Sequence, residues 1–326
     1  MPLDPIAYKP YTDPDDFIRE VTDLIWVNRA IGFIRENYEP DSIVHGGLGT
    51  AVGRDEVIEG TLMRISDTPD RIGQAEDVIW EARGDDAFLS SHLVLSADPN
   101  NDIISRTIAN CLYRRGRMVE EWVVRDTLAA ALQQGLDPDE VARTKAFRGY
   151  VGSITEAPQP DVLAAGDSGP RPDDFRPEVE LVLDFIQQVW NDRDLEKVDD
   201  FFVRDLVLQT VGGKTIIRPE GYRRQLLKMI RPFPAGQFEV RDIATNDDVR
   251  YAGLRIAVVW KFSGHYNGTA DFGPLTGSPV DVLGISQFLV QNGRIVREVR
   301  LYDEIALRAQ IAARRGDVPY TGTNIY

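Results

Sequence analysis

The sequence predicts an α+β fold built as a tandem duplication of one unit, in which helices pack on a strongly curved, mostly antiparallel sheet. Three observations support this prediction. The chain has 326 residues, about twice the usual length of a single domain. Two segments far apart in the chain repeat each other, and in each half helical patterns precede a series of strand patterns. A curved sheet closed by helices forms a cone with an internal cavity, where a ligand would bind.

The repeat is clearest between GRMVEEWVVRDTLAAALQQ (116–134) and GRIVREVRLYDEIALRAQI (293–311). The identical pairs are Gly116/Gly293, Arg117/Arg294, Val119/Val296, Glu121/Glu298, Asp126/Asp303, Ala129/Ala306 and Gln133/Gln310. Upstream, the order of matching residues continues at a smaller offset, which pairs Asp77 with Asp242. The second copy therefore holds extra residues between its central strands, and we place them at 265–279.

The first unit opens with a helical stripe of apolar residues over 16–38 and a second helix over 55–65. Four segments with strand character follow: EDVIWEA (76–82), DAFLSSHLVLSA (86–97), DIISRTIANCLYR (102–114) and GRMVEEWVVRD (116–126). The second unit repeats this order. Its helices are expected at 182–189, 195–203 and 219–230, and its strands at 236–245, 251–264, 280–291 and 293–303. Gly116 and Gly293 stand in tight turns of the hairpin kind.

These patterns divide the chain into an N-terminal arm (1–15), a first domain (16–148), a linker (149–176), a second domain (177–315) and a C-terminal tail (316–326). The linker prediction rests on composition, because 149–177 is rich in proline and glycine and has no apolar period.

Composition excludes several classes of function. The net charge of −15 repels phosphate backbones and anionic lipid, so we expect no nucleic-acid partner and no membrane partner. The single cysteine, Cys111, excludes an internal disulfide and a multi-cysteine metal site, and the three histidines lie far apart. We therefore expect neither a metal nor a cofactor. The start of the chain lacks the pattern of a signal peptide and no apolar stretch approaches a membrane span, which together predict a cytoplasmic protein.

Asp126 is the first candidate for chemistry. On the last strand of the first unit it shares a face with Trp122 and Val124, so its carboxylate could be a partly desolvated general acid or base. The alternative is that Asp126 caps the helix TLAAALQQ that follows it, because aspartate is a favoured N-cap residue. Spacing alone leaves both interpretations open.

The histidines supply further candidates. His92 lies in the strand pattern FLSSHLVLS, and a neutral imidazole can accept a proton at neutral pH; the alternative is a histidine that fills space in the sheet beside Ser90. His45 precedes two glycines whose turn can explain the pattern without a functional role. His265 and Tyr266 open the glycine-rich insertion of the second unit, which is either a loop over a cavity mouth or a plain surface loop.

Both halves resemble the SnoaL-like polyketide cyclases of the nuclear-transport-factor-2-like superfamily. The first half resembles them through VGRDEVIEG (52–60), EDVIW (76–80), the serines and His92 at 90–92, and RTIANCLYRRGRMVEEWVVRD (106–126). The second half does so through 263–304, which includes a long loop with several glycines.

The resemblance implies a cone-shaped α+β barrel that performs a cofactor-independent aldol ring closure on a small, largely apolar carbonyl compound, or an isomerisation. It maps the family's acid/base carboxylate to Asp126 and to Asp303, with His92 as partner or oxyanion donor. Further ligand contacts are expected from the following residues of the two units: His45, Trp80, Trp122, His265, Tyr266 and Arg297. The enzyme class implied is a lyase or isomerase.

The departures from the family pattern leave alternatives open. The insertion reads Gly264-His265-Tyr266-Asn267-Gly268, with Tyr266 where the family's histidine belongs, and the first unit lacks this loop. Arg297 shares a strand face with Asp303 and could hold it as a salt bridge. The second hypothesis is a non-catalytic small-molecule-binding module, and the third is an epoxide or ester hydrolase of the same fold. We also expect the two units to pack as an intrachain pseudo-dimer; a further homodimer of whole chains stays open.

Overall fold

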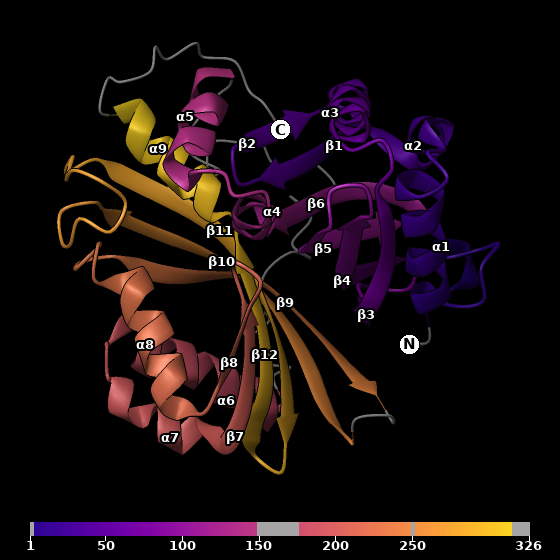
Figure 1. Ribbon diagram of the computed structural model, residues 1–326. Coiled ribbons are helices and arrows are strands. Elements are labelled where there is room, and N and C mark those ends of the chain that lie inside the picture. Colours follow the sequence, from indigo (N-terminus) through magenta and orange to yellow (C-terminus); the bar gives the residue numbers. More distant parts are fainter. Residues whose placement is uncertain (1–2, 149–175, 249–251, 315–326) are drawn as a thin grey trace.

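The computed structural model describes residues 3–148, 176–248 and 252–314. It contains two six-stranded sheets of the same strand order, β2-β1-β6-β5-β4-β3 and β8-β7-β12-β11-β10-β9. In each sheet one neighbouring pair is parallel, β1 with β6 and β7 with β12, and the other pairs are antiparallel. This repeated topology confirms the α+β tandem duplication (Figure 1).

The first unit contains a short 3-10 helix, five α-helices and six strands among the described residues. Its elements are η1 (Pro5–Ala7), α1 (Pro14–Trp26), α2 (Ile31–Asn37), β1 (Tyr38–Gly46), β2 (Gly49–Val52), α3 (Arg54–Asp67), β3 (Ile72–Ala82), β4 (Ala87–Asp98), β5 (Ile103–Arg114), β6 (Arg117–Arg125), α4 (Thr127–Gln133) and α5 (Pro138–Arg148).

The second unit follows the same order. Its elements are α6 (Pro177–Phe185), the π-helix η3 (Ile186–Asn191), η4 (Leu195–Lys197), α7 (Val198–Phe201), β7 (Phe202–Thr210), β8 (Lys214–Ile217), α8 (Pro219–Ile230), β9 (Gln237–Asp248), β10 (Gly253–His265), β11 (Pro279–Gln291), β12 (Arg294–Tyr302) and α9 (Glu304–Arg314). The predicted insertion at 265–279 falls between β10 and β11, as expected.

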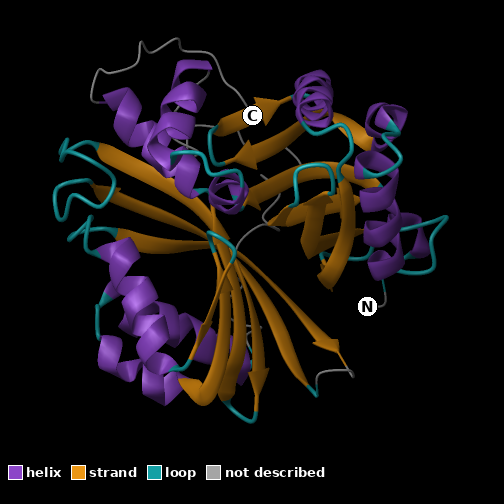
Figure 2. Ribbon diagram, in the orientation of Figure 1, coloured by secondary structure: helices purple, strands orange, loops and turns teal. Residues whose placement is uncertain are grey.

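Each sheet is open, with β2 and β3 or β8 and β9 at its edges, so helices and not strands complete the cone. In the first unit α1, α2 and α3 cover one face of the sheet, and α6, α7 and α8 cover the corresponding face in the second unit (Figure 2). The uncovered faces lie against each other, because Leu93, Ile108 and Val124 of the first unit belong to the apolar core of the second. The two units therefore form an intrachain pseudo-dimer.

The helix expected over 16–38 is broken into α1 and α2. Arg29, in the connection between them, has a positive φ of 56°, a backbone conformation that a right-handed helix cannot contain. The hairpin turns were predicted correctly. Arg115 and Gly116 both have positive φ, as do Asn292 and Gly293, and this is the pattern of a tight turn that joins antiparallel strands.

Two of the expected segments lie almost entirely outside the described residues: the linker at 149–176, of which Arg176 alone is described, and the tail at 316–326. Within the segment expected as an N-terminal arm, η1 and the start of α1 are formed, and Ala7 is fully buried against the first unit. In the described part of the chain, no helix is both long enough and apolar enough to cross a membrane.

Candidate functional site

Alternation along β6 sends its side chains to two different environments. Glu121, Val123 and Arg125 point towards α1 and line a cavity inside the first unit. Trp122 and Val124 point the opposite way and pack against the second unit. The alternation was predicted from the sequence, but the face that carries the cavity is the one opposite to that assigned.

The cavity lies between α1, α2 and α3 on one side and β4, β5 and β6 on the other. Its volume is about 50 Å³, enough for a few water molecules or a very small organic molecule. The lining is mostly apolar, with a few titratable side chains, and consists of Ile18, Val21, Thr22, Ile25, Trp26, Ile34, Tyr38, Val57, Thr61, Arg71, His92, Val94, Thr107, Ala109, Cys111, Tyr113, Glu121, Val123 and Arg125.

His92 is the histidine that lines this cavity. It is 8% exposed, and its Nδ1 atom has no hydrogen-bond partner among the described residues. Burial lowers the pKa of His92 to about 4, with a smaller contribution from the nearby charge of Arg19. The imidazole is therefore neutral at neutral pH, with one ring nitrogen that carries a hydrogen and one that carries a lone pair.

Glu121 is the carboxyl group of the cavity. Burial raises its pKa, although the charges of Arg125 and Arg64 act in the opposite direction. Strand register places it beside Cys111 on β5, while His92 on β4 lies beside Ala109. Because β5 separates β4 from β6 and the two positions are offset by two residues along the strands, the two titratable groups stand about 12 Å apart at the backbone, on either side of a floor of small residues.

Cys111 and Tyr113 are two further polar residues of the lining. Burial is the main cause that raises the pKa of both groups well above its ordinary value, and each also lies near Glu121. A thiol and a phenol in this state stay protonated, so they serve as weak hydrogen-bond donors and not as nucleophiles.

Asp126 lies outside this cavity. Its side chain caps α4 by accepting a hydrogen bond from the Ala129 N–H at 3.0 Å. It also accepts from the N–H groups of Gly212 and Gly213, both at 2.8 Å, which belong to the turn between β7 and β8 of the second unit. The carboxylate thus fastens the two units together. It is separated from His92 because the two side chains leave opposite faces of the sheet.

Asp303 has the corresponding place in the second unit. It caps α9 through the Ala306 N–H at 2.9 Å and accepts a hydrogen bond from the Thr127 hydroxyl of the first unit at 2.5 Å. Gly47, in the turn between β1 and β2, packs directly on its Cβ atom. Burial raises the pKa of Asp303. Both aspartates therefore lie where the end of one unit meets a turn of the other.

His45 and Trp122 come together, but on the face that points to the second unit. Their rings stack with centroids 5.5 Å apart, and His45 Nε2 lies 2.7 Å from a carboxylate oxygen of Glu120. Trp80 packs into the apolar core of the first unit instead. None of these three candidates lines the cavity.

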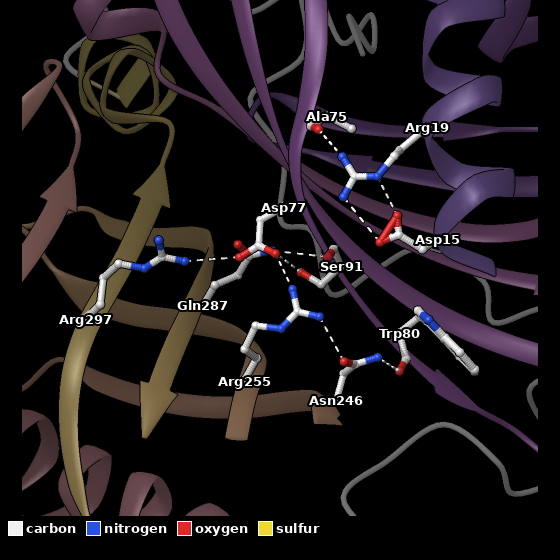
Figure 3. A network of polar contacts seen from close by, with 10 residues as sticks. All are labelled: Asp15, Arg19, Ala75, Asp77, Trp80, Ser91, Asn246, Arg255, Gln287 and Arg297. Atoms are coloured by element: carbon white, nitrogen blue, oxygen red, sulfur yellow. Dashed lines mark hydrogen bonds and ion pairs between the residues drawn. The ribbon is translucent and has the colours of Figure 1, made fainter. Parts of the chain in front are cut away.

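Arg297 does not reach Asp303. Five strand residues lie between them, and six steps along an extended chain span about 20 Å. Arg297 instead pairs with Asp77 of the first unit at 3.1 Å. Arg255 binds the same carboxylate from the other side, so that Asp77 lies between the two arginines (Figure 3). The expected salt bridge within the second unit is replaced by one between the units.

The other two candidates of the second unit belong to its insertion. Tyr266 is fully buried, and its hydroxyl donates to the Gly273 carbonyl at 2.6 Å and accepts from the Phe272 N–H at 2.9 Å. It therefore holds the loop in shape. The neighbouring His265 is exposed.

The interior of the second unit is filled by its own side chains. Arg300 is 2% exposed and lies over the rings of Trp190 and Tyr222, at 5.3 Å and 5.0 Å from the ring centroids. The Tyr222 hydroxyl donates to Glu298 at 2.7 Å and accepts from Arg300 at 2.9 Å. The space that is a cavity in the first unit is thus occupied by a hydrogen-bonded network.

One sequence difference accounts for much of this contrast. Glu121 and Glu298 are equivalent, but the residue two positions further along the strand is Val123 in the first unit and Arg300 in the second. Arg300 fills the interior and compensates the charge of Glu298. Val123 does neither, so Glu121 faces open space. Sequence reasoning missed Glu121 because it placed the cavity on the other face of the strand; the identity of Glu121 and Glu298 in the repeat was the available signal.

No group of three or more histidine, cysteine, aspartate or glutamate side chains within the described ranges is arranged to hold a metal ion. Mostly apolar walls, a neutral imidazole and a carboxyl group of raised pKa form instead a site suited to binding a small uncharged or singly charged molecule and to moving a proton.

Comparison with known proteins places the second unit in a class of small α+β domains. Residues 180–311 match the model of the SnoaL-like polyketide cyclase family. The second unit is therefore similar to SnoaL-like domains, and the first unit repeats its strand order.

Several solved structures resemble part of this chain, at low sequence identity and low TM-score. A protein from Jannaschia sp. CCS1, assigned as a SnoaL-like polyketide cyclase, is 18% identical over 44% of this chain and 97% of its own, with a TM-score of 0.39. IdmH from Streptomyces antibioticus, assigned as a polyketide cyclase, is 20% identical over 42% and 99%, with a TM-score of 0.37. No curated protein matches the chain.

Proposed function

We propose that the first unit is a cofactor-independent acid/base catalyst that acts on a small, largely apolar carbonyl compound, by isomerisation or by intramolecular aldol ring closure. The observation that carries the proposal is the cavity itself: Glu121 and the neutral His92 lie on either side of a floor formed by Ala109 and Cys111, inside walls that are mostly apolar. The family match of the second unit agrees with this class of activity.

The roles follow from the protonation states. His92 is neutral, so its ring N–H can donate a hydrogen bond to a carbonyl oxygen without first losing a proton. This bond strengthens as negative charge develops on that oxygen, which is the form of electrostatic stabilisation that lowers a barrier most. Glu121 has a raised pKa, which brings a carboxyl group closer to the working pH of a general acid or base.

The reaction then begins when the Glu121 carboxylate takes a proton from the carbon next to the carbonyl group. The C–H bond breaks, an O–H bond forms on Glu121, and the electron pair moves into an enolate whose oxygen accepts from His92. Isomerisation ends when Glu121 returns the proton to another carbon. In ring closure the enolate carbon attacks a second carbonyl carbon, and Glu121 gives its proton to the resulting alkoxide.

Asp126 and Asp303, the carboxylates that the family resemblance indicated, have a different role in this proposal. The two oxygens of Asp126 already accept three backbone N–H groups, which commits this side chain to the cap of α4 and to the contact between units. We assign both aspartates to positioning and the proton transfer to Glu121.

Proton exchange in D₂O tests the proposal directly. Butanone and cyclopentanone are small, largely apolar ketones, and the loss of their α-protons is measured by NMR. We expect the protein to accelerate exchange and Glu121→Gln to lose about 10²-fold or more of that acceleration. Glu59→Gln, an exposed glutamate on α3, is the matched control and should leave the rate unchanged. Full exchange by Glu121→Gln would overturn the assignment.

Two other outcomes decide between functions. If both ketones bind in the cavity and neither exchanges, the first unit is a binding module, an interpretation that the small, mostly apolar cavity also allows. If ¹⁸O from solvent enters the product of an epoxide or ester probe at an accelerated rate, the activity is hydrolysis.

A further inference from the structure

One end of the first unit's cavity is cationic. Arg71 lies between α3 and β3 and lines the cavity. Its guanidinium is half-buried, stacks over the Trp26 ring at 5.2 Å and donates to the Ser96 hydroxyl at 2.5 Å. Among the described residues no carboxylate forms an ion pair with it. A desolvated guanidinium without an acidic partner is costly in a folded protein, and this one stands in a chain of net charge −15.

Arg125 lies at the same end. Strand register aligns it with Thr107 on β5, which in turn pairs with Val94 on β4, and Ser96 is two residues further along β4. The guanidinium held by Ser96 and that of Arg125 are therefore neighbours. Burial, with a smaller contribution from the charge of Arg125, lowers the pKa of Arg71 to about 10. Both cations line the cavity, and Thr107 adds a hydroxyl between them.

The polar groups deeper in the cavity differ from this end. His92 is one sheet position further in and neutral, and Glu121 is a further position in, with a pKa raised by burial. The charge along the cavity therefore changes with position on β5, from two guanidiniums beside Thr107 to the protonated phenol of Tyr113 near the end of the strand.

The second unit lacks this arrangement. The residue equivalent to Arg125 is Tyr302, and the residue at the position of Arg71, immediately before the first long strand, is Gly236. The one buried arginine of that interior described above, Arg300, is already paired with Glu298. The cationic end therefore belongs to the unit whose cavity is open.

We propose that Arg71, with Arg125, binds a carboxylate group of the ligand, so that the molecule taken up by the first unit is a small organic acid whose apolar part extends past His92. The guanidinium fork of arginine matches a carboxylate in two hydrogen bonds, and the anion would offset the repulsion between the two cations. The inference concerns the cavity of the proposed function and names its substrate class, but it requires binding alone.

The test compares propanoate with propanamide, which has the same shape and no charge, by ligand-observed NMR titration at low salt. We expect propanoate to bind the full-length protein about tenfold more tightly, the difference between a charged and a neutral hydrogen-bonded contact. Arg71→Gln should abolish this preference and Arg71→Lys should keep part of it. Arg117→Gln, an exposed arginine at the start of β6, should leave it unchanged.

Equal binding of propanoate and propanamide by the wild-type protein would overturn the inference, and so would a preference that Arg71→Gln retains in full. Thermal unfolding of each variant identifies any that does not fold, and Arg71→Lys then supplies the comparison. Failure of the proposed function is seen separately. Glu121→Gln should keep the preference for propanoate while it loses ketone exchange. A wild-type protein that prefers propanoate but exchanges no ketone would refute only the catalytic proposal.

Discussion

Replacement of Asp126 by asparagine separates a structural role from a catalytic one. The side chain is 3% exposed, and its two oxygens accept from Ala129, Gly212 and Gly213. Asparagine has the same size but a single acceptor oxygen. If that oxygen keeps the bonds to Ala129 and Gly212, the new NH₂ group faces the Gly213 N–H, and two donors oppose each other.

The cost can be worked from these contacts. One hydrogen bond to a charged group is lost, which is worth about 1.5–3 kcal/mol, and the N–H left without an acceptor adds a desolvation penalty of about 1–3 kcal/mol. We expect Asp126→Asn to lower the free energy of unfolding by about 3 kcal/mol in total. For domains of this size that corresponds to a decrease in Tm of about 6–12 °C.

Thermal unfolding followed by tryptophan fluorescence measures this change, with ketone exchange assayed on the same samples at a temperature where the variant is folded. Asp41→Asn, an exposed aspartate on β1, is the control and should stay within about 0.5 kcal/mol of wild type. We expect a large loss of stability with exchange retained. An unchanged Tm together with lost exchange would show that Asp126 acts on the substrate.

Three further predictions concern other buried titratable groups. Burial raises the pKa of Asp242 from 3.8 to about 6, so between these pH values the folded state binds a proton that the unfolded state releases. The free energy of unfolding of wild type, relative to that of Asp242→Asn, should therefore fall as the pH rises from about 4 to about 6 and stay level above, as measured by urea unfolding. A rise over that range would contradict the raised pKa. Arg300→Met leaves Glu298 buried without its cation and should lower the free energy of unfolding by about 3–5 kcal/mol. The double variant with Glu298→Gln should recover much of that free energy. If the effects of the two substitutions simply add, the two residues are not coupled. The NMR signals of the His92 ring should stay constant from pH 5.5 to 8 and titrate near pH 4, so a midpoint above 6 would exclude the neutral imidazole that the mechanism uses.

The fold could be predicted from the sequence because its signals are local or repeated. The pairs Gly116/Gly293 and Asp126/Asp303 fixed the equivalence of the last hairpins, since each glycine is required by a turn of positive φ. The break at Arg29 could not be predicted, because the apolar stripe continues through it and the packing of α2 decides where the helix ends.

The candidate site was predictable only in part. Alternation on β6 is a property of any strand, but the choice of face depends on which side the helices cover and which the second unit covers, and that is decided by contacts far apart in the sequence. The apolar neighbours of Asp126 were read as a ligand pocket when they are the contact between units. For the same reason Trp122 packs against the second unit, while His92, on the other face, lines the cavity.

The open cavity also depends on a residue that no motif marks. Val123 and Arg300 are aligned by the repeat, yet the difference matters only because both side chains point to the interior of their units. Sequence comparison shows the substitution; the structure shows that it closes one cavity and leaves the other open.

The central claim is that the first unit's cavity, and not the strand-end aspartates, is where the protein binds its substrate. A crystal of the full-length protein soaked with butanone tests this directly. The account predicts electron density over Ala109, with the carbonyl oxygen within hydrogen-bonding distance of His92. Density in contact with Asp126 or Asp303, or inside the second unit beside Arg300, would contradict it.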